Sequence, residues 1–344
     1  MEYCIGLDLH QQYSVLVVKE RLGRLVQRGK VPNDAEALRA FLAPLHGGTI
    51  TVAVEATSNY YWMYETLEAL GCTVKLAHPL KVRAIASARI KTDQIDAGVL
   101  CDLLRGDLLP TSYIPPAAIR ELRELLRHRV RLVHDRTLGK NRLQAILTKL
   151  NHRVPCTDVF GKTGRAWLST VALPAVFALQ RDQLLAQIDH LTALVQQLDG
   201  RIRTLATTLP EARRLMAIPG LGAFSSLLIV AEVGEIRRFP SPKQLVSYAG
   251  LAPGVYASGQ THHGRGITRQ GSRYLRWILC EAIKHLVRTP GPLQLTYQEL
   301  RRAKGHGKAT VACARKLLVG IFYVLRDGVP FAPVCRRPLL VMSR

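Results

Sequence analysis

Short apolar runs alternate with helical patterns over the first hundred or so residues. Runs at Tyr3–Leu9 and Ser14–Lys19 flank the polar segment His10-Gln11-Gln12 and predict the two arms of a β-hairpin. A third strand at Leu25–Val31 would complete a three-stranded meander. The pattern then predicts, in order, a helix at Asp34–Leu45, a strand at Thr49–Val54, a helix at Tyr60–Leu70 and a strand at Thr73–Ala77.

This succession of elements indicates the fold class. A three-strand meander followed by strand, helix and strand is the order of the ribonuclease-H-like α/β fold, although other mixed sheets share it. We therefore expect such a domain over residues 1–112, a helical segment over 113–210 and a mainly α-helical domain over 211–330. Residues 331–344 are expected to form a loose basic tail.

A long helical pattern from Arg120 to Leu150 is strongly basic. A solvated helix face normally mixes the two signs of charge, so we favour a phosphate-facing surface here and select Arg127 and Arg131 as nucleic-acid contacts. The acidic residues of this stretch are Glu121, Glu124 and Asp135, and the basic residues are Arg120, Arg123, Arg127, Arg129, Arg131, Arg136, Lys140, Arg142 and Lys149.

A heptad seam follows between Pro174 and Pro210. Apolar residues recur there at alternating steps of four and three residues, which is typical of a coiled coil. The seam would pair either between chains or antiparallel with the basic helix, and we favour pairing between chains, as a dimer or tetramer. Its residues are Leu184, Ile188, Leu191, Val195, Leu198, Ile202 and Leu205.

The overall charge of the chain indicates what kind of partner the protein binds. The chain has 344 residues with 48 Lys plus Arg against 25 Asp plus Glu, a formal net charge of +23. Such an excess favours a polyanion, and nucleic acid offers phosphates at short, regular intervals. No apolar run is long enough for a membrane span and no signal peptide is evident, so we expect a cytoplasmic protein without a membrane partner.

The seven cysteines are scattered, and none form the two-residue spacing of a zinc site. We therefore expect reduced structural thiols.

The candidate catalytic groups are carboxylates. Asp8 stands inside the apolar run Ile5–Leu9, where burial of its charge requires compensation by a metal ion or by a local hydrogen bond. Glu55 follows the next β run directly, at the strand end where α/β sheets gather ligands, although a helix N-terminus would also favour it.

Asp93 and Asp96 supply the other two carboxylates. They are three residues apart at the start of a predicted helix and project from one face, with Thr92 as an expected N-cap. Taken alone, this pair is more typical of capping than of catalysis. Four converging carboxylates, however, repel one another by roughly 4 kcal/mol per pair at about 4 Å, unless cations intervene. Oxygen ligands without Cys or His favour Mg²⁺ (or Mn²⁺), which would clamp a phosphodiester.

A glycine turn marks the start of the last domain. Gly220 and Gly222, in Ile218–Gly222, are typical of a helix-hairpin-helix turn whose backbone N–H groups approach phosphate, although a tight turn between packed helices has the same pattern. Further on, Arg265, Arg269, Arg273 and Arg276 surround a glycine-rich stretch and are predicted to contact nucleic acid.

An ordered set of short words across the chain resembles the insertion-sequence 110, or DEDD, transposases. No single word is specific, but together they cover nearly the entire chain in the family's order. The words are Gly6-Leu7-Asp8, Val54-Glu55-Ala56-Thr57, Lys91-Thr92-Asp93-Gln94-Ile95-Asp96-Ala97, Ile218-Pro219-Gly220-Leu221-Gly222, Tyr248-Ala249-Gly250-Leu251-Ala252-Pro253, Ser258-Gly259, Arg265-Gly266 and Gly271-Ser272-Arg273-Tyr274-Leu275-Arg276.

The resemblance implies a RuvC-like nuclease-fold domain, a coiled-coil connection and a transposase domain with a nucleophilic serine, here Ser258. By itself Ser258 would be an ordinary loop serine, and the adjacent His262 and His263 point apart too much for a metal pair. The resemblance further implies a recombinase directed by a structured guide (bridge) RNA that pairs with target and donor DNA. It also implies a multimer in which the metal site of one protomer works beside the serine of another.

Two other functions fit the residues less well. The first is a resolvase-like DNA nuclease in which metal-activated water cuts DNA and Ser258 is structural. The second is a non-catalytic RNA or DNA scaffold in which the acidic residues only cap helices.

Overall fold

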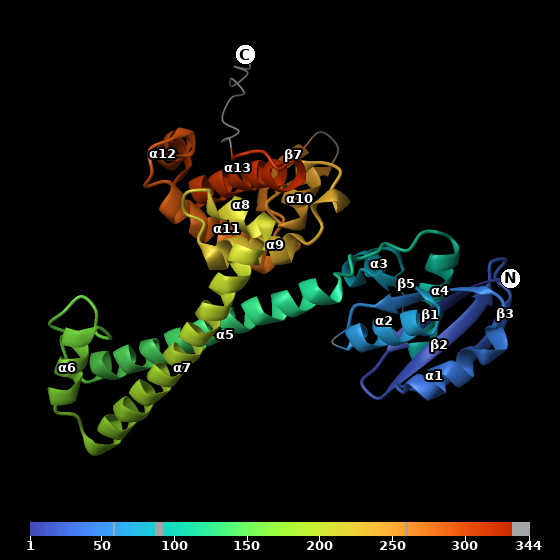
Figure 1. Ribbon diagram of the computed structural model, residues 1–344, viewed down its shortest axis with the longest axis horizontal. Coiled ribbons are helices and arrows are strands. Elements are labelled where there is room, and N and C mark those ends of the chain that lie inside the picture. Colours follow the sequence, from blue (N-terminus) through green and yellow to red (C-terminus); the bar gives the residue numbers. More distant parts are fainter. Residues whose placement is uncertain (58, 87–91, 259–260, 332–344) are drawn as a thin grey trace, which may run out of the picture. The chain divides into compact units, whose positions relative to one another are not determined.

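The computed structural model describes residues 1–57, 59–86, 92–258 and 261–331 and divides the chain into two compact units. The first unit is Met1–Ile114, and the second begins at Pro115 (Figure 1). Most of the expected tail, residues 332–344, lies outside the described residues. Within the described residues, no helix is both long enough and apolar enough to cross a membrane.

A five-stranded mixed sheet forms the centre of the first unit. Its order is β3-β2-β1-β4-β5, with β1 antiparallel to β2, β2 antiparallel to β3, and β4 parallel to both β1 and β5. Every predicted strand is confirmed to within about two residues at its ends. The strands are β1 (Glu2–Leu9), β2 (Tyr13–Glu20), β3 (Leu25–Pro32), β4 (Thr49–Glu55) and β5 (Thr73–Ala77).

Helices cover both faces of this sheet because the strands alternate their side chains. Ile5 and Leu7 of β1 pack with residues of α1 and α2 on one face, whereas Cys4 packs with α4 on the other. An α/β class is therefore confirmed. The helices are α1 (Ala35–Leu42), a 3-10 turn η1 (Ala43–Leu45), α2 (Tyr60–Ala69), α3 (Pro79–Ile85) and α4 (Asp93–Arg105).

Helix α4 lies unusually close to β1, at Gly6. A Cβ atom added to Gly6 would stand 1.9 Å from the carbonyl oxygen of Ala97 and 2.5 Å from the amide nitrogen of Cys101. The side chain of Thr92 caps the helix by accepting a hydrogen bond from the amide of Ile95 at 3.3 Å. The first turn of α4 is thereby held near the carboxyl end of β1.

Two long antiparallel helices open the second unit (Figure 1). Leu132 of α5 packs with Leu191 and Val195 of α7, and a Cβ added to Gly139 would stand 3.2 Å from Ile188. The heptad seam therefore packs within this chain, and our preference for pairing between chains is not supported by the seam. The elements are α5 (Ala117–Lys149), α6 (Lys162–Thr170) and α7 (Ala175–Thr208).

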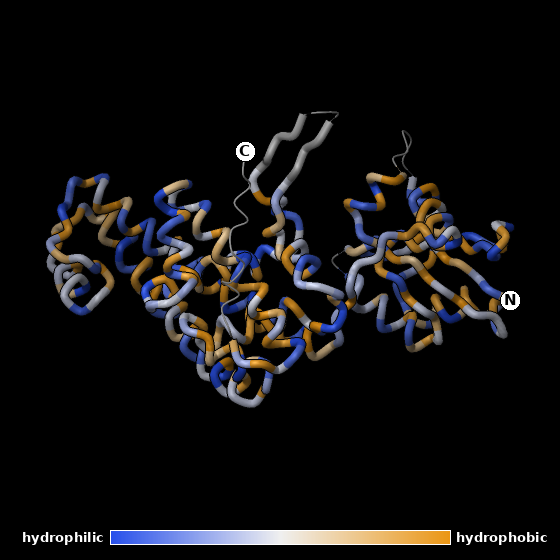
Figure 2. Tube along the Cα trace, turned by 90° about the horizontal axis from the view of Figure 1, so that it is seen from above, coloured by the Kyte–Doolittle hydropathy of each residue, from blue (hydrophilic) through white to orange (hydrophobic). Residues whose placement is uncertain are grey.

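The rest of the second unit is a helical cluster with one small hairpin. The amino-terminal part of α5 and the carboxyl-terminal part of α7 belong to its core. Leu122, Leu126 and Ile202 are buried there with residues of α9, α11 and α13. In Figure 2, the helices of this unit alternate between hydrophilic and hydrophobic colours along their length, as expected for helices buried on one face. The elements are α8 (Pro210–Met216), α9 (Ala223–Val233), η2 (Ile236–Arg238), α10 (Pro242–Tyr248), β6 (Pro253–Ser258), β7 (Thr261–Ile267), α11 (Arg273–Leu286), α12 (Pro292–Lys304) and α13 (His306–Asp327).

Residues 113–210 were expected to form a segment separate from residues 211–330. In the described structure α5 and α7 share a core with the later helices, and the chain from Pro115 onward forms one compact unit, so a separate segment ending at residue 210 stays a prediction. The shared core forms because the apolar faces of α5 near its start and of α7 near its end are buried against helices that follow much later in the sequence.

Candidate active site

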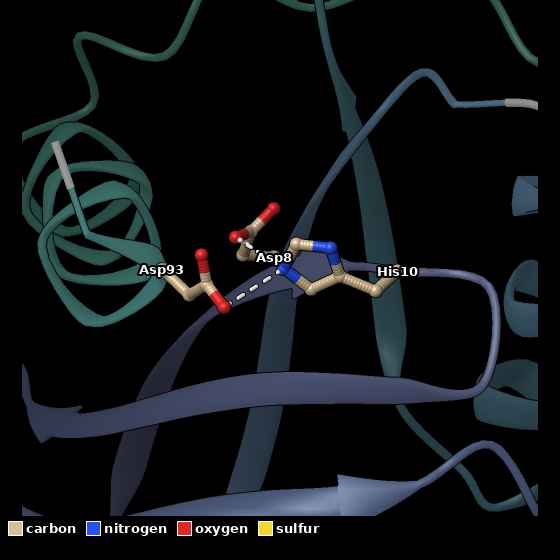
Figure 3. Close-up of side chains that lie close together, drawn as sticks. All are labelled: Asp8, His10 and Asp93. Atoms are coloured by element: carbon tan, nitrogen blue, oxygen red, sulfur yellow. Dashed lines mark ion pairs between the residues drawn. The ribbon is translucent and has the colours of Figure 1, made fainter.

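Asp8 and Asp93 meet at the end of strand β1, with His10 between them (Figure 3). The Nε2 atom of His10 lies 3.2 Å from Oδ2 of Asp8 and 3.1 Å from Oδ2 of Asp93. Asp8 is the least exposed of the three, at 15% for its side chain. Two of the four predicted carboxylates therefore contact the same imidazole nitrogen, from opposite elements β1 and α4.

Glu55 lies at the same edge of the sheet. Strands β1 and β4 run parallel, and their register pairs Leu7 with Val54. Asp8 and Glu55 are the next residues on these neighbouring strands, and Glu55 also pairs with Ala77 of β5. The parallel register therefore brings both carboxylates to the carboxyl ends of adjacent strands.

Asp96 belongs to the same electrostatic environment. It follows Asp93 within the first turn of α4, which Gly6 allows to lie against β1. Burial raises the pKa of the Asp8 carboxyl, nearby His10 lowers it, and the charges of Asp93 and Asp96 raise it further. This repulsion among carboxylates is the condition that a bound cation would relieve.

His10 was not singled out by the sequence analysis, which assigned it to a hairpin turn. A signal was present, because residues two apart on a strand point to the same face, and His10 follows Asp8 by two. The structure buries the Nε2 atom, and among the described residues it has no well-formed hydrogen bond. Two carboxylate oxygens nevertheless lie within 3.2 Å of that nitrogen.

These side chains fit a divalent cation. One ligand atom each from Asp8, His10 and Asp93 lies within 4.8 Å of the other two, and among the described residues no other group of three such side chains does so. Carboxylate oxygens and imidazole nitrogen are both ordinary ligands of divalent ions. Tyr13 supports the cluster from the side, with its hydroxyl donating to Oδ2 of Asp93 at 3.3 Å.

The predicted nucleic-acid contacts on α5 have partners within the protein. Arg127 forms two hydrogen bonds to the buried carboxylate of Glu232, at 2.9 and 3.1 Å. Arg131 lies 3.4 Å from Glu124 on the exposed face of its own helix. Whether either residue also contacts phosphate stays a prediction.

Glu232 is a second residue that sequence analysis missed. It is 1% exposed and accepts hydrogen bonds from Arg127 and from the hydroxyl of Ser272, the latter at 2.8 Å. Ser272 is in turn the N-cap of α11, accepting from the amide of Leu275 at 3.1 Å. A signal was present, because Glu232 stands inside the apolar run Leu227–Val233, as Asp8 does inside Ile5–Leu9.

The arginines after the hairpin differ in their surroundings. Arg276 donates to the carbonyl oxygens of Ala249 and Arg269, at 3.2 and 3.3 Å, whereas Arg273 donates to the hydroxyl of Tyr274 at 3.1 Å. Arg269 is exposed and has a positive φ of 56°. Ser258 and Arg265 lie in β6 and β7, and their side chains are outside the described part of the structure.

The glycine turn precedes α9, beside a pocket of about 340 Å³. Gly220 has a φ of +84°, and a Cβ there would stand 3.1 Å from the backbone of Ala282 and Leu286. This is the geometry of a tight turn between packed helices. Gly222 is the N-cap of α9 and has open space around it, so its expected phosphate contact stays a prediction.

Comparison with known proteins gives matches in both units. Residues 5–152 match a family model described as a transposase, and residues 212–298 match a model described as transposases of the IS116/IS110/IS902 family. The two models together span well over half of the chain.

Individual relatives extend this similarity over most of the chain. The chain is 27% identical over 364 residues to the insertion element IS110 uncharacterized 43.6 kDa protein of Streptomyces coelicolor, with 89% of each chain covered. It is 24% identical to the transposase for insertion sequence element IS1328 of Yersinia enterocolitica, over 95% of this chain and 98% of that one. A 32% identical match over 151 residues covers 42% of this chain and 47% of the pilin gene-inverting protein of Moraxella bovis. The chain therefore belongs to the insertion-sequence 110 family of transposases and is a DNA-recombining enzyme.

Proposed function

We propose that this transposase cuts and rejoins DNA through a Mg²⁺ or Mn²⁺ site held by Asp8, Glu55, Asp93 and Asp96, together with a nucleophilic serine, Ser258. The observation that carries the metal site is the meeting of Asp8, His10 and Asp93 at the edge of the sheet where Glu55 ends β4. The strand order β3-β2-β1-β4-β5 supports a ribonuclease-H-like, RuvC-like fold for this domain.

The carboxylates and the serine would have different roles in the reaction. A divalent cation, when bound, would stabilise the negative charge that builds up on the attacked phosphate. Asp8 and Glu55 offer ligands from rigid strand ends, and Asp93 and Asp96 offer them from one helix turn. Ser258 would form a bond to phosphorus while one phosphodiester oxygen departs with a proton, leaving DNA joined to the protein.

The expected nucleic-acid surface comes from the second unit. The net charge of +23 supports binding of DNA and RNA, and Arg265, Arg269 and Arg273 are the arginines nearest the proposed serine in sequence. Similarity to a protein named for inverting a pilin gene supports rearrangement of defined DNA segments. We further propose that a structured guide RNA selects the target and donor sites.

Trapping of protein-linked DNA tests the serine and the metal site separately. Ser258→Ala should abolish the covalent adduct, and Asp8→Asn should abolish cleavage altogether. Asp102→Asn is the matched control, because Asp102 lies on the same helix as Asp93 but pairs with Lys19 at 2.7 Å. An adduct that persisted in Ser258→Ala would overturn the assignment of the serine.

The two alternatives predict other outcomes. A resolvase-like nuclease would cut DNA in Ser258→Ala at a near-normal rate, leave 5′-phosphate ends and form no adduct. A non-catalytic scaffold would show the same activity with Asp8 or Asn at position 8.

The guide is tested by purifying the protein with cellular RNA and sequencing what stays bound. Recovery of one structured transcript would support guided recombination. Random transcripts would contradict it.

A further inference from the structure

We propose that His10 is itself a metal ligand, so that the ion binds one imidazole nitrogen among carboxylate oxygens and the site prefers Mn²⁺ to Mg²⁺. The inference rests on the proposed metal site and adds to it a ligand that the four-carboxylate pattern does not contain. Figure 3 shows the imidazole directed toward both carboxylates.

The distances suit this role. Nε2 of His10 lies 3.2 Å from Asp8 and 3.1 Å from Asp93, and all three ligand atoms lie within 4.8 Å of one another. An ion of the usual ligand distance, about 2.0 to 2.2 Å, requires ligand atoms roughly 3 Å apart. The nitrogen atom is also buried, and the polar atoms that the described residues place beside it are these two carboxylate oxygens.

The backbone of His10 is fixed from several directions. Its carbonyl oxygen accepts hydrogen bonds from the side-chain amides of Asn33 and Asn59, at 2.8 and 3.0 Å. Its amide donates to the carbonyl oxygen of Tyr13 at 3.0 Å, and Asn33 is held by the hydroxyl of Ser14 at 2.7 Å. An ordinary turn histidine does not need this support, whereas a ligand benefits from an imposed position.

The ring itself is also supported. The centroid of the Tyr13 ring lies 4.6 Å from that of His10, and the Tyr13 hydroxyl donates to the same Asp93 oxygen that faces Nε2. Lys30 lies over the Tyr13 ring at 3.6 Å from its centroid. One aromatic side chain therefore positions two of the three ligands.

The metal preference follows from the donor set. Mg²⁺ strongly favours oxygen ligands and releases water reluctantly, whereas imidazole suits first-row transition ions and carboxylates suit Mn²⁺ as well as Mg²⁺. Replacing one carboxylate or water ligand with neutral imidazole therefore weakens Mg²⁺ binding more than Mn²⁺ binding. A protonated His10 that merely neutralises Asp8 and Asp93 is the competing explanation, in which the ion would displace the ring.

Pulsed electron paramagnetic resonance of Mn²⁺ bound to the full-length protein distinguishes these explanations. We expect ¹⁴N modulation from a directly bound imidazole, converted to the ¹⁵N pattern when histidine is ¹⁵N-labelled. His10→Gln should abolish the modulation and weaken Mn²⁺ binding roughly tenfold or more, with a smaller effect on Mg²⁺. His46→Gln, at an exposed histidine of the same unit, should change neither.

A rescue variant guards against misfolding. His10→Asp should restore ion binding without the nitrogen signal and with the preference moved toward Mg²⁺. Mn²⁺ binding to the wild type without nitrogen modulation, at an affinity that His10→Gln leaves unchanged, would overturn the proposal while leaving the carboxylate site intact. No Mn²⁺ binding, or binding that Asp8→Asn leaves unchanged, would instead contradict the proposed metal site.

Discussion

At Gly6, strand β1 lacks the side chain that would keep helix α4 away. The missing side chain matters because α4 contains Asp93 and Asp96. The distance between α4 and β1 decides whether these two carboxylates lie near Asp8. At the same scale, His10 follows Asp8 by two residues and places its Nε2 atom 3.2 Å from that carboxylate. Single residues thus determine whether the candidate site is assembled at all.

Gly6→Ala should destabilise the protein and weaken binding of the divalent ion. Its Cβ would stand 1.9 Å from a backbone oxygen of α4, so the helix must move, at a cost of about 1–3 kcal/mol or more. Urea unfolding and Mn²⁺ titration measure the two effects. The matched control is Gly98→Ala on α4, where no atom of the described residues lies within 4 Å of the added Cβ and a gain of roughly 0.5–1 kcal/mol is expected. Equal stability of the Gly6→Ala variant and the wild type would contradict the close approach.

A buried thiol on the same helix should make stability fall at alkaline pH. Burial raises the pKa of Cys101 from 9.0 to about 11, so this thiol stays protonated in the folded protein while it ionises near pH 9 in the unfolded chain. Ionisation then favours the unfolded state, and stability decreases as pH rises from about 9 to 11. The urea midpoint should therefore drop less between pH 8 and pH 11 in Cys101→Ala than in the wild type. An identical drop in both proteins would show that the thiol does not contribute.

At the scale of elements, a buried ion pair joins three helices of the second unit. Arg127 of α5 pairs with Glu232 of α9, and Glu232 also accepts from Ser272, which caps α11. Arg123 donates to the carbonyl oxygens of Ala231 and Glu232 at 2.7 and 2.9 Å. The long basic helix is therefore fastened to the helical cluster by its arginines as well as by its apolar face.

Glu232→Ala should cost about 3–5 kcal/mol, because it leaves the part-buried guanidinium of Arg127 without its partner. Glu235→Ala, at an exposed glutamate three residues later, should stay within about 0.5 kcal/mol of the wild type. Chemical denaturation of the full chain measures both. A small effect at Glu232 would mean that water solvates Arg127 readily and that the network is not important for stability.

At the scale of the whole molecule, the chain has two compact units, and the long helices belong to the second. Each unit has its own apolar core and its own candidate chemistry, with the carboxylates in the first and the serine hairpin in the second. This division predicts at which position the chain can be divided into two fragments that still fold.

Fragments 1–114 and 115–344 should each fold when expressed alone, whereas a cut at 210/211 should leave the carboxyl-terminal fragment unfolded. The second cut removes Leu122, Leu126 and Ile202 from the core that they share with α9 and α11. Circular dichroism melts of the fragments provide the measurement. A cooperative transition in fragment 211–344 would support the three-part division expected from the sequence.

Much of the first unit was predictable because its signals are local. Alternation of apolar residues located the five strands, and strand ends together with the Thr92 cap located the carboxylates. Patterns of period 2 or 3.6 reflect which face of one element is buried, and they need no knowledge of what covers that face. The heptad seam shows the limit, since its residues and two possible partners were recognised but the pattern did not decide between those partners.

The sequence by itself determined the elements, the basic charge and the candidate carboxylates, because each follows from neighbouring residues or from composition. Only the tertiary structure decided that His10 faces Asp8 and Asp93, that Glu232 holds Arg127, and that α7 packs on α5 in the same chain. The physical reason is that these contacts join residues from different elements. Which residues meet depends on the close approach at Gly6 and on the packing of whole helices, and neither is encoded in any single stretch of chain.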